Sequence, residues 1–194
     1  MQKKKVPKTL KELSSAHVEA LKTTFDKILH EHFLFNTDYD QHKFIYHQLR
    51  DIILSKRPDA QITLYGSSLF QCCLKEANII DIDIQFKDVL PYDTLKELLQ
   101  TVSHSAHYKD ARINIDHDPL AIDLSVLNSN LHVRLTSNNI RAIRLSQIIQ
   151  IYTKFDERVL PLIRLLRILS KVSFVNQKKE LNKVFFNFLF RYAT

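Results

Sequence analysis

Cysteine and glycine are scarce in this chain of 194 residues, and no apolar run approaches the length of a membrane span. The two cysteines, Cys72 and Cys73, are adjacent and make no disulfide framework, which is typical of a reducing cell interior. Arg164 and Arg167 interrupt the most apolar helical segment, and the opening residues lack the apolar core of a secretory signal. The nine histidines are scattered without metal-ligand spacing. We therefore expect an intracellular, cytoplasmic protein with no membrane partner and no zinc site.

What the chain does have is an apolar content of 45% and an uneven distribution of charge. The apolar fraction is sufficient for a globular core. Residues 134–194 carry 12 Lys and Arg against 3 Asp and Glu, whereas residues 1–133 carry 16 against 18. A basic C-terminal third suggests that a polyanion lies along one side of the protein. Within this third, Arg164, Arg167 and Lys171 are spaced to share one helical stripe, and we expect them to bind RNA phosphates.

The only glycine, Gly66, stands where the chain has reason to need one. The four residues before it are typical strand formers, and Ser67 or Ser68 can cap a short helix after it. Glycine enters left-handed backbone regions easily and lets a ligand approach the main chain. A strand, a Gly-Ser turn and a helix N-terminus together form a corner suited to phosphate. Gly66, Ser67 and Ser68 are therefore predicted to bind a nucleotide.

A clean alternation of apolar and polar residues follows in residues 79–86. Asp81 and Asp83 share one face of the predicted strand, and the isoleucines between and beside them share the other. Two carboxylates at i and i+2 can hold Mg²⁺ or Mn²⁺ against a triphosphate, so both are predicted as catalytic metal ligands. We expect both carboxylates to open toward the turn at Gly66 and Ser67.

Periodicity predicts the remaining elements. Apolar residues at helical spacing indicate helices at 9–34, from a cap at Asn36 to Lys56, after a cap at Asp93 or Thr94, and beyond Thr136. Further strands are predicted at 61–65, 112–115, 120–127 and 131–136. A helix over residues 181–192 would be apolar nearly all round, because the segment is rich in phenylalanine. We expect this tail to dock on downstream helices or on a second chain.

Together these motifs resemble those of the DNA-polymerase-beta-like nucleotidyltransferases, and within them the terminal uridylyltransferases and non-canonical poly(A) polymerases. Residues 135–139, 150–152 and 155–159 are similar to that family's run from the last palm strand into its helical domain. The resemblance implies an α+β fold, with a nucleotidyltransferase palm of about five mixed strands flanked by helices and part of a helical lobe. It assigns residues 1–34 to a basic tail and a helix packing on the lobe, 35–155 to the palm, and 156–194 to the start of a truncated helical domain.

The chain also departs from active members of this family. They carry metal carboxylates twelve and fourteen residues after the turn glycine, where this chain has Asn78 and Ile80. The third family carboxylate is matched by Arg134 in one alignment and by Asp123 in another. We favour Arg134, because the other alignment requires a longer connection to residues 152–156. An arginine there would pair with the acidic strand and take the place of the metal.

This departure leads to three functional hypotheses. The chain is most similar to the inactive N-terminal module of multi-domain terminal uridylyltransferases, which implies a catalytically impaired domain acting in RNA 3′-end uridylation by binding RNA or an RNA-binding protein. The alternative is an active Mg²⁺- or Mn²⁺-dependent enzyme that adds UMP or AMP to RNA 3′ ends with Asp81, Asp83 and Asp123. The third is a purely structural assembly domain. The directions in which Asp123 and Arg134 point separate the first two.

Overall fold

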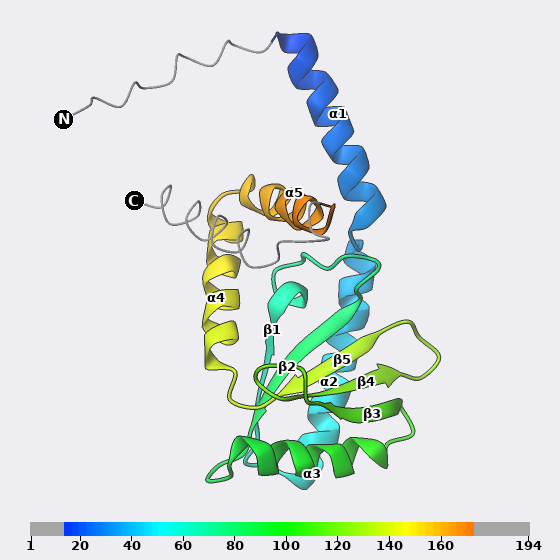
Figure 1. The fold of residues 1–194 in the computed structure, drawn as a ribbon, viewed down its shortest axis with the longest axis vertical. Helices are drawn as coiled ribbons and strands as arrows, with labels where there is room; N and C mark the ends of the chain where they lie inside the picture. Colours follow the sequence, from blue (N-terminus) through cyan, green and yellow to red (C-terminus); the bar gives the residue numbers. More distant parts are fainter. Residues whose placement is uncertain (1–13, 173–194) are drawn as a thin grey trace, which may run out of the picture.

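The computed structural model describes residues 14–172, which form one five-stranded sheet with α-helices around it (Figure 1). In chain order the elements are α1 (Ser15–His32), α2 (Asn36–Lys56), β1 (Gln61–Tyr65), the short 3₁₀ helix η1 (Gly66–Ser68), β2 (Ile79–Gln85), α3 (Pro91–Ser103), β3 (Tyr108–Asn114), β4 (Ala121–Val126), β5 (His132–Thr136), α4 (Ile140–Phe155) and α5 (Val159–Val172). The predicted helix over residues 181–192 and the basic tail at 1–13 lie outside the described residues.

The strand order is β1-β2-β5-β4-β3. The pair β2–β5 is parallel, and the other three neighbouring pairs are antiparallel. Strands far apart in the chain, β2 and β5, thus lie side by side in the middle of the sheet. The prediction of an α+β fold with a mixed sheet of about five strands is confirmed.

Alternation along the strands sorts the side chains onto two faces. On β2, Ile80, Ile82 and Ile84 are fully buried, and they share the main core with Leu49 of α2 and Leu98 of α3. The opposite face of the sheet carries the polar and charged residues. Every acidic candidate from the sequence is therefore on the face that α2 and α3 leave uncovered.

Most predicted boundaries agree with the structure, and the differences have local causes. Helix α3 begins at Pro91 rather than after Asp93, because proline is well suited to the first helical turn. Strand β3 begins at Tyr108, before the predicted start at Arg112, and a register shift between Lys109 and Arg112 interrupts its alternation.

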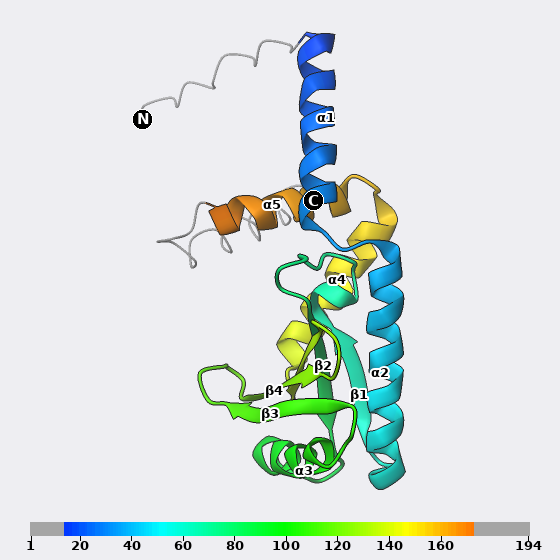
Figure 2. The ribbon, with the colours of Figure 1, turned by 90° about the vertical axis from the view of Figure 1, so that its right-hand side faces the viewer.

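Helix α1 extends away from the sheet, at the end of the molecule opposite to α3 (Figures 1 and 2). Ser14, which directly precedes the helix, accepts a hydrogen bond from the amide of His17 and so caps α1. The C-terminal end of α1 contacts α5 through a small second core around Phe33, Ile149 and Ile163. None of the helices in residues 14–172 is long and apolar enough to cross a membrane.

Candidate functional site

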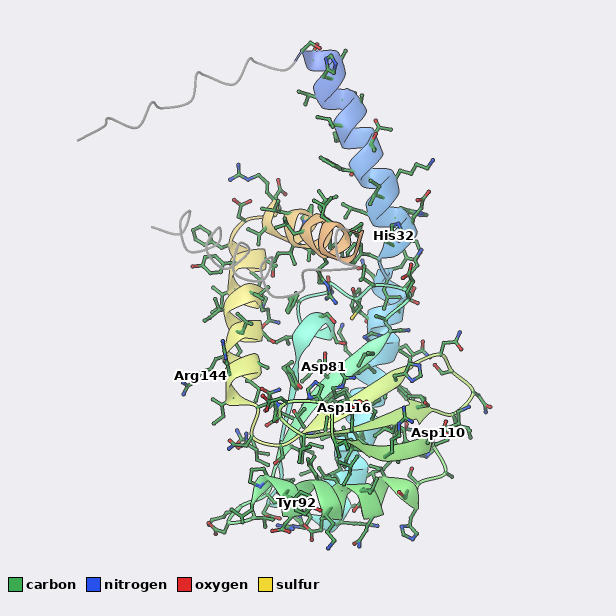
Figure 3. The ribbon with its side chains drawn as sticks, viewed as in Figure 1. His32, Asp81, Tyr92, Asp110, Asp116 and Arg144 are labelled. Atoms are coloured by element: carbon green, nitrogen blue, oxygen red, sulfur yellow. The ribbon has the colours of Figure 1, made fainter. Side chains whose placement is uncertain are left out.

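Five residues, one from each strand, form a row across the polar face of the sheet. The strand register pairs Tyr65 with Asp81, Asp81 with Arg134, Arg134 with Asp123, and Asp123 with Arg112. Directly paired residues point to the same side of a sheet, so their side chains are neighbours. Figure 3 shows Asp81 near the middle of the sheet, just below η1. The sequence posed Arg134 and Asp123 as alternatives, but the structure places both on this face.

Arg134 and Asp123 form the clearest ion pair of the row. The Nε of Arg134 donates to Oδ1 of Asp123 at 2.8 Å, and both side chains are about one-quarter exposed (24% and 26%). The second oxygen of Asp123 accepts from Nδ2 of Asn114 at 2.6 Å. Burial pushes the pKa of Asp123 upward, but the hydrogen bonds from Arg134 and Asn114 outweigh it and hold that pKa below its usual value. Asp123 is therefore a carboxylate whose two oxygens are already in use.

Asp81 lies on the other side of Arg134 and against the turn. A Cβ atom at Gly66 would stand 2.5 Å from Oδ2 of Asp81, so the carboxylate touches the backbone at this position. Burial raises the pKa of Asp81 to about 6, although the charge of Arg134 acts in the opposite direction. Asp81 is thus close to the turn, as predicted, and its charged form is disfavoured there.

Asp83 is held differently, and the prediction that its carboxylate opens toward the turn is wrong. Asp83 is 1% exposed. Its Oδ1 accepts from Oγ1 of Thr136 and from the backbone amide of Asn139, both at 2.9 Å, and its Oδ2 accepts from Nε2 of Gln85 at 2.9 Å. Three donors fix this carboxylate at the junction between β5 and α4, so in this structure it links secondary-structure elements.

Gly66 has the backbone conformation that only glycine adopts easily, with φ of +71°. Its amide donates to the hydroxyl of Ser146 on α4 at 2.8 Å. This amide is therefore already used inside the protein. The turn geometry expected at Gly66 is confirmed, while nucleotide binding by this residue stays a prediction.

The two serines of the turn differ in their surroundings. Ser68 is 8% exposed, and its hydroxyl lies 3.2 Å from Nδ1 of His42, a fully buried histidine of α2. The Nε2 of His42 lies 2.6 Å from the side-chain oxygen of Asn78, and burial lowers the pKa of His42. Ser67 is only partly buried, with its hydroxyl 3.3 Å from the sulfur of Cys73. Ser68 therefore anchors the turn from behind, which leaves Ser67 as the serine nearer to the surface.

His42 and Ser146 were missed in the sequence. Each fixes the turn from a helix that is distant in the chain, α2 and α4 respectively. One histidine among nine and one serine on a helix carry no local signal of such a contact. Only the packing of both helices beside the turn reveals it.

The residues predicted to bind RNA lie on α5, beside the loop that follows the turn. Arg164 donates through Nε and Nη2 to the carbonyl of Gln71, at 3.1 and 2.6 Å, and Arg167 donates through Nη1 to the carbonyl of Cys72 at 2.8 Å. These bonds attach α5 to residues 71–72. Lys171 falls in the last turn of α5, where the side chains are not described. RNA binding by this stripe remains a prediction, and the two arginines already have a role in packing.

Two hollows open on the polar face, on either side of Arg134. One, of about 580 Å³, lies between the sheet and the start of α4 and is lined by Tyr65, Asp81, His117 and Asn139 among others. The other, of about 420 Å³, lies over β3, β4 and β5 and is lined by Arg112, Asp123, His132 and Arg134 among others. Tyr65 and Asp81 border the first hollow, and the Arg134–Asp123 pair borders the second.

The residues of this face do not fit a divalent metal ion. The carboxylate of Asp83 already accepts three hydrogen bonds, and both oxygens of Asp123 are bonded to donors. The guanidinium of Arg134 stands between Asp81 and Asp123 in the row. In residues 14–172, no three His, Cys, Asp or Glu side chains are grouped so that they could hold a metal ion.

Comparison with known proteins gives consistent family matches. The family model described as the TUTase nucleotidyltransferase domain matches residues 1–123. Terminal uridylyltransferase 4 of Mus musculus is 24% identical over 168 residues, which cover 86% of this chain and 10% of that protein. Terminal uridylyltransferase 7 of Homo sapiens is 23% identical over 177 residues, which cover 89% of this chain and 12% of that protein. The chain thus spans about a tenth of the length of these curated relatives.

Solved structures agree on the fold. The Cid1 poly(U) polymerase with bound MgGTP superposes with a TM-score of 0.67 at 18% identity, covering 79% of this chain and 48% of that one. The structure of the GLD-2/RNP-8 complex gives a TM-score of 0.71 at 16% identity, covering 82% of this chain and 52% of the other. At these identities the likeness concerns the fold, which is that of the nucleotidyltransferases.

Proposed function

Because the chain belongs to the family of TUTase nucleotidyltransferase domains, we propose that it is a catalytically impaired member that acts in RNA 3′-end uridylation by binding RNA or an RNA-binding protein. The observation that carries the proposal is the position of Arg134. Its guanidinium lies in register between Asp81 and Asp123 and is bonded to the latter at 2.8 Å. A fixed positive charge thus occupies the middle of the only row that carries two facing carboxylates in residues 14–172.

The energetic consequence of this charge is large. At an effective dielectric constant near 20, a unit positive charge about 4 Å from a divalent ion raises its energy by about 8 kcal/mol. Arginine cannot lose its proton to relieve this repulsion. Two-metal phosphoryl transfer needs carboxylates that are free to bind the ions. In this protein two of the three candidate carboxylates, those of Asp83 and Asp123, are instead bonded to protein donors.

The proposed role in RNA binding is supported by charge and by the relatives. Residues 134–194 carry 12 Lys and Arg against 3 Asp and Glu, a net charge of +9, whereas residues 1–133 carry 16 against 18, a net charge of −2. Such an excess favours association with a phosphate backbone. Among the similar proteins, Cid1 is a poly(U) polymerase, and GLD-2 is found in a complex with RNP-8. Partner binding by this chain is proposed on the same basis.

The direct test is an extension assay. Purified protein is incubated with a short RNA, each of the four nucleoside triphosphates, and Mg²⁺ or Mn²⁺, and products are resolved by length. We expect no extension above a blank without protein, while an active terminal uridylyltransferase used as a positive control extends the same RNA. Binding of the unextended RNA is measured in parallel, because the proposal requires binding without synthesis.

An active enzyme is the second candidate, and one observation favours it. Asp123 lies on the same face and in the same row as Asp81, as the family's third carboxylate would. If the wild-type protein extends RNA and Asp81→Ala and Asp123→Ala each abolish the extension, this second candidate replaces the first. A matched variant, Asp51→Ala, changes an exposed carboxylate on α2 and should leave any such activity unchanged.

A further inference from the structure

The hollow over β3, β4 and β5 is lined by two guanidinium groups that have unused donors. The Nε of Arg134 is bonded to Asp123, but within residues 14–172 neither of its Nη atoms has a hydrogen-bond partner. Arg112 is exposed, and in the same part of the chain its side chain makes no hydrogen bond or ion pair. Both line the same hollow of about 420 Å³. The two groups therefore offer several N–H donors to one space.

The strand register places these two arginines on either side of the same residue, Asp123. Arg112 and Arg134 are both paired with Asp123, one from each neighbouring strand. Adjacent strands are about 4.8 Å apart, so the two Cα atoms are about 10 Å apart with Asp123 between them. Two long side chains on the same face can meet over a small group at that spacing. The fork geometry of arginine suits the oxygens of a phosphate or carboxylate.

The carboxylate below this point is already engaged by two other donor atoms. Both oxygens of Asp123 are already bonded, to Arg134 Nε and to Asn114 Nδ2. The next row along the strands adds Ser125 and His132, whose side chains lie 3.2 Å apart and also line the hollow. Asp110 is the one negatively charged lining residue for which residues 14–172 provide no hydrogen-bond or ion-pair partner. It is exposed on the β3 side of the sheet (Figure 3).

We propose that this hollow is an anion site, and that its ligand is a phosphate monoester such as the terminal phosphate of an RNA. The inference rests on the proposed RNA-binding function and adds the chemistry of the RNA end. A monoester carries between one and two negative charges at neutral pH and three terminal oxygens, so it can engage Arg112 and Arg134 together. A phosphodiester carries one charge and offers fewer terminal oxygens to the same pair. The face that in this fold would be expected to bind a cation thus has the donors to bind an anion.

The experiment measures binding of one short RNA sequence in three forms, with a 3′-phosphate, with a 5′-phosphate and with two hydroxyl ends. Fluorescence anisotropy is recorded at constant ionic strength, because non-specific phosphate contacts depend strongly on salt. We expect one phosphorylated form to bind about tenfold more tightly than the hydroxyl form, which is the size of effect that charge-assisted bonds to a phosphate provide. Inorganic phosphate should compete for this extra affinity.

Three variants locate the site. Arg112→Gln changes an exposed side chain and should abolish the preference for the phosphorylated end without affecting folding. Arg134→Gln should also abolish this preference. Arg144→Gln removes an equal charge from the exposed face of α4 and should leave the preference intact (Figure 3). Asp110→Asn removes the opposing charge at the rim and should tighten binding of the phosphorylated form by about twofold to threefold.

The outcomes separate this inference from the function on which it rests. Equal affinity for the three RNA forms would overturn the anion site and leave RNA binding standing. A preference that survives Arg112→Gln, or weaker binding in Asp110→Asn, would also overturn it. If no RNA form binds, the proposed RNA-binding function fails. The site is then judged by whether inorganic phosphate raises the melting temperature of the wild-type protein but not of Arg112→Gln.

Discussion

Replacing Asp81 by asparagine is expected to stabilise the protein at neutral pH. Burial raises the pKa of this carboxyl to about 6, from about 3.9 in an unfolded chain. Each pKa unit corresponds to about 1.4 kcal/mol, so ionised Asp81 lowers the free energy of unfolding by up to about 3 kcal/mol above pH 6. Because the side chain is partly exposed, we expect Asp81→Asn to recover about 1–3 kcal/mol at pH 8.

The sign of the pH dependence gives the sharper test. The folded state binds the proton of Asp81 more tightly than the unfolded state does, so this group makes the wild-type protein lose stability as pH rises from about 4 to about 6. In Asp81→Asn that part of the loss should be absent, and the two proteins should be nearly equally stable at pH 4. Urea unfolding of both at pH 4, 6 and 8 measures this.

The control for this experiment is Asp51→Asn, which changes an exposed carboxylate on α2 and should alter stability by less than about 0.5 kcal/mol at each pH. If Asp81→Asn is equally stable or less stable than the wild type at pH 8, the argument from burial is refuted. The attraction between Asp81 and Arg134 would then outweigh desolvation. A confirmed gain would mean that the protein retains a carboxylate beside the turn at a cost in stability, which is typical of functional positions.

Further predictions concern the same turn, the ion pair and the C-terminal third. Gly66→Ala should lower the free energy of unfolding by at least about 1 kcal/mol, because of the positive φ at this position and the contact with Asp81. Urea unfolding measures this change, and an unchanged urea midpoint would contradict it. A double-mutant cycle of Arg134→Met and Asp123→Asn should give a coupling of about 1 kcal/mol in the free energy of unfolding. A coupling of zero would show that the ion pair does not contribute to stability. RNA affinity should fall steeply between low and high salt, and a flat dependence would exclude binding through phosphates. A chain ending near Val175 should be more soluble and more monomeric in size-exclusion chromatography than the full chain. A monomeric full chain together with an unfolded shortened chain would instead assign residues 181–192 to the core.

The site as a whole combines a turn that is held from two helices with a row of paired charges beside it. The turn keeps its glycine and is held from two helices, by His42 on α2 and Ser146 on α4. The acidic strand keeps Asp81 next to that turn, but Asp83 serves the junction to α4. Arg134 on β5 is bonded to Asp123, the remaining candidate carboxylate, on the neighbouring strand β4.

Local patterns in the sequence predicted the elements and their faces. The alternation in residues 79–86 assigned Ile80, Ile82 and Ile84 to the core, and the structure buries all three. The single glycine marked the turn, and its φ of +71° explains why. Such features depend on residues within one turn or one strand, where backbone geometry dictates the period and the conformation. The resemblance of the motifs to the nucleotidyltransferases then gave the fold.

The chemistry of the site depended on contacts between segments that are far apart in the chain. Arg134 meets Asp81 because β5 inserts beside β2 in parallel, and it meets Asp123 because β4 follows on its other side. A shift of one residue in either register would turn Arg134 to the opposite face. Register is set by the packing of the whole core rather than by any local pattern. By itself the sequence therefore determined the turn and the acidic residues beside it, and only the tertiary structure decided that Arg134 and Asp123 are partners, that Asp83 is not open, and that His42 and Ser146 hold the turn.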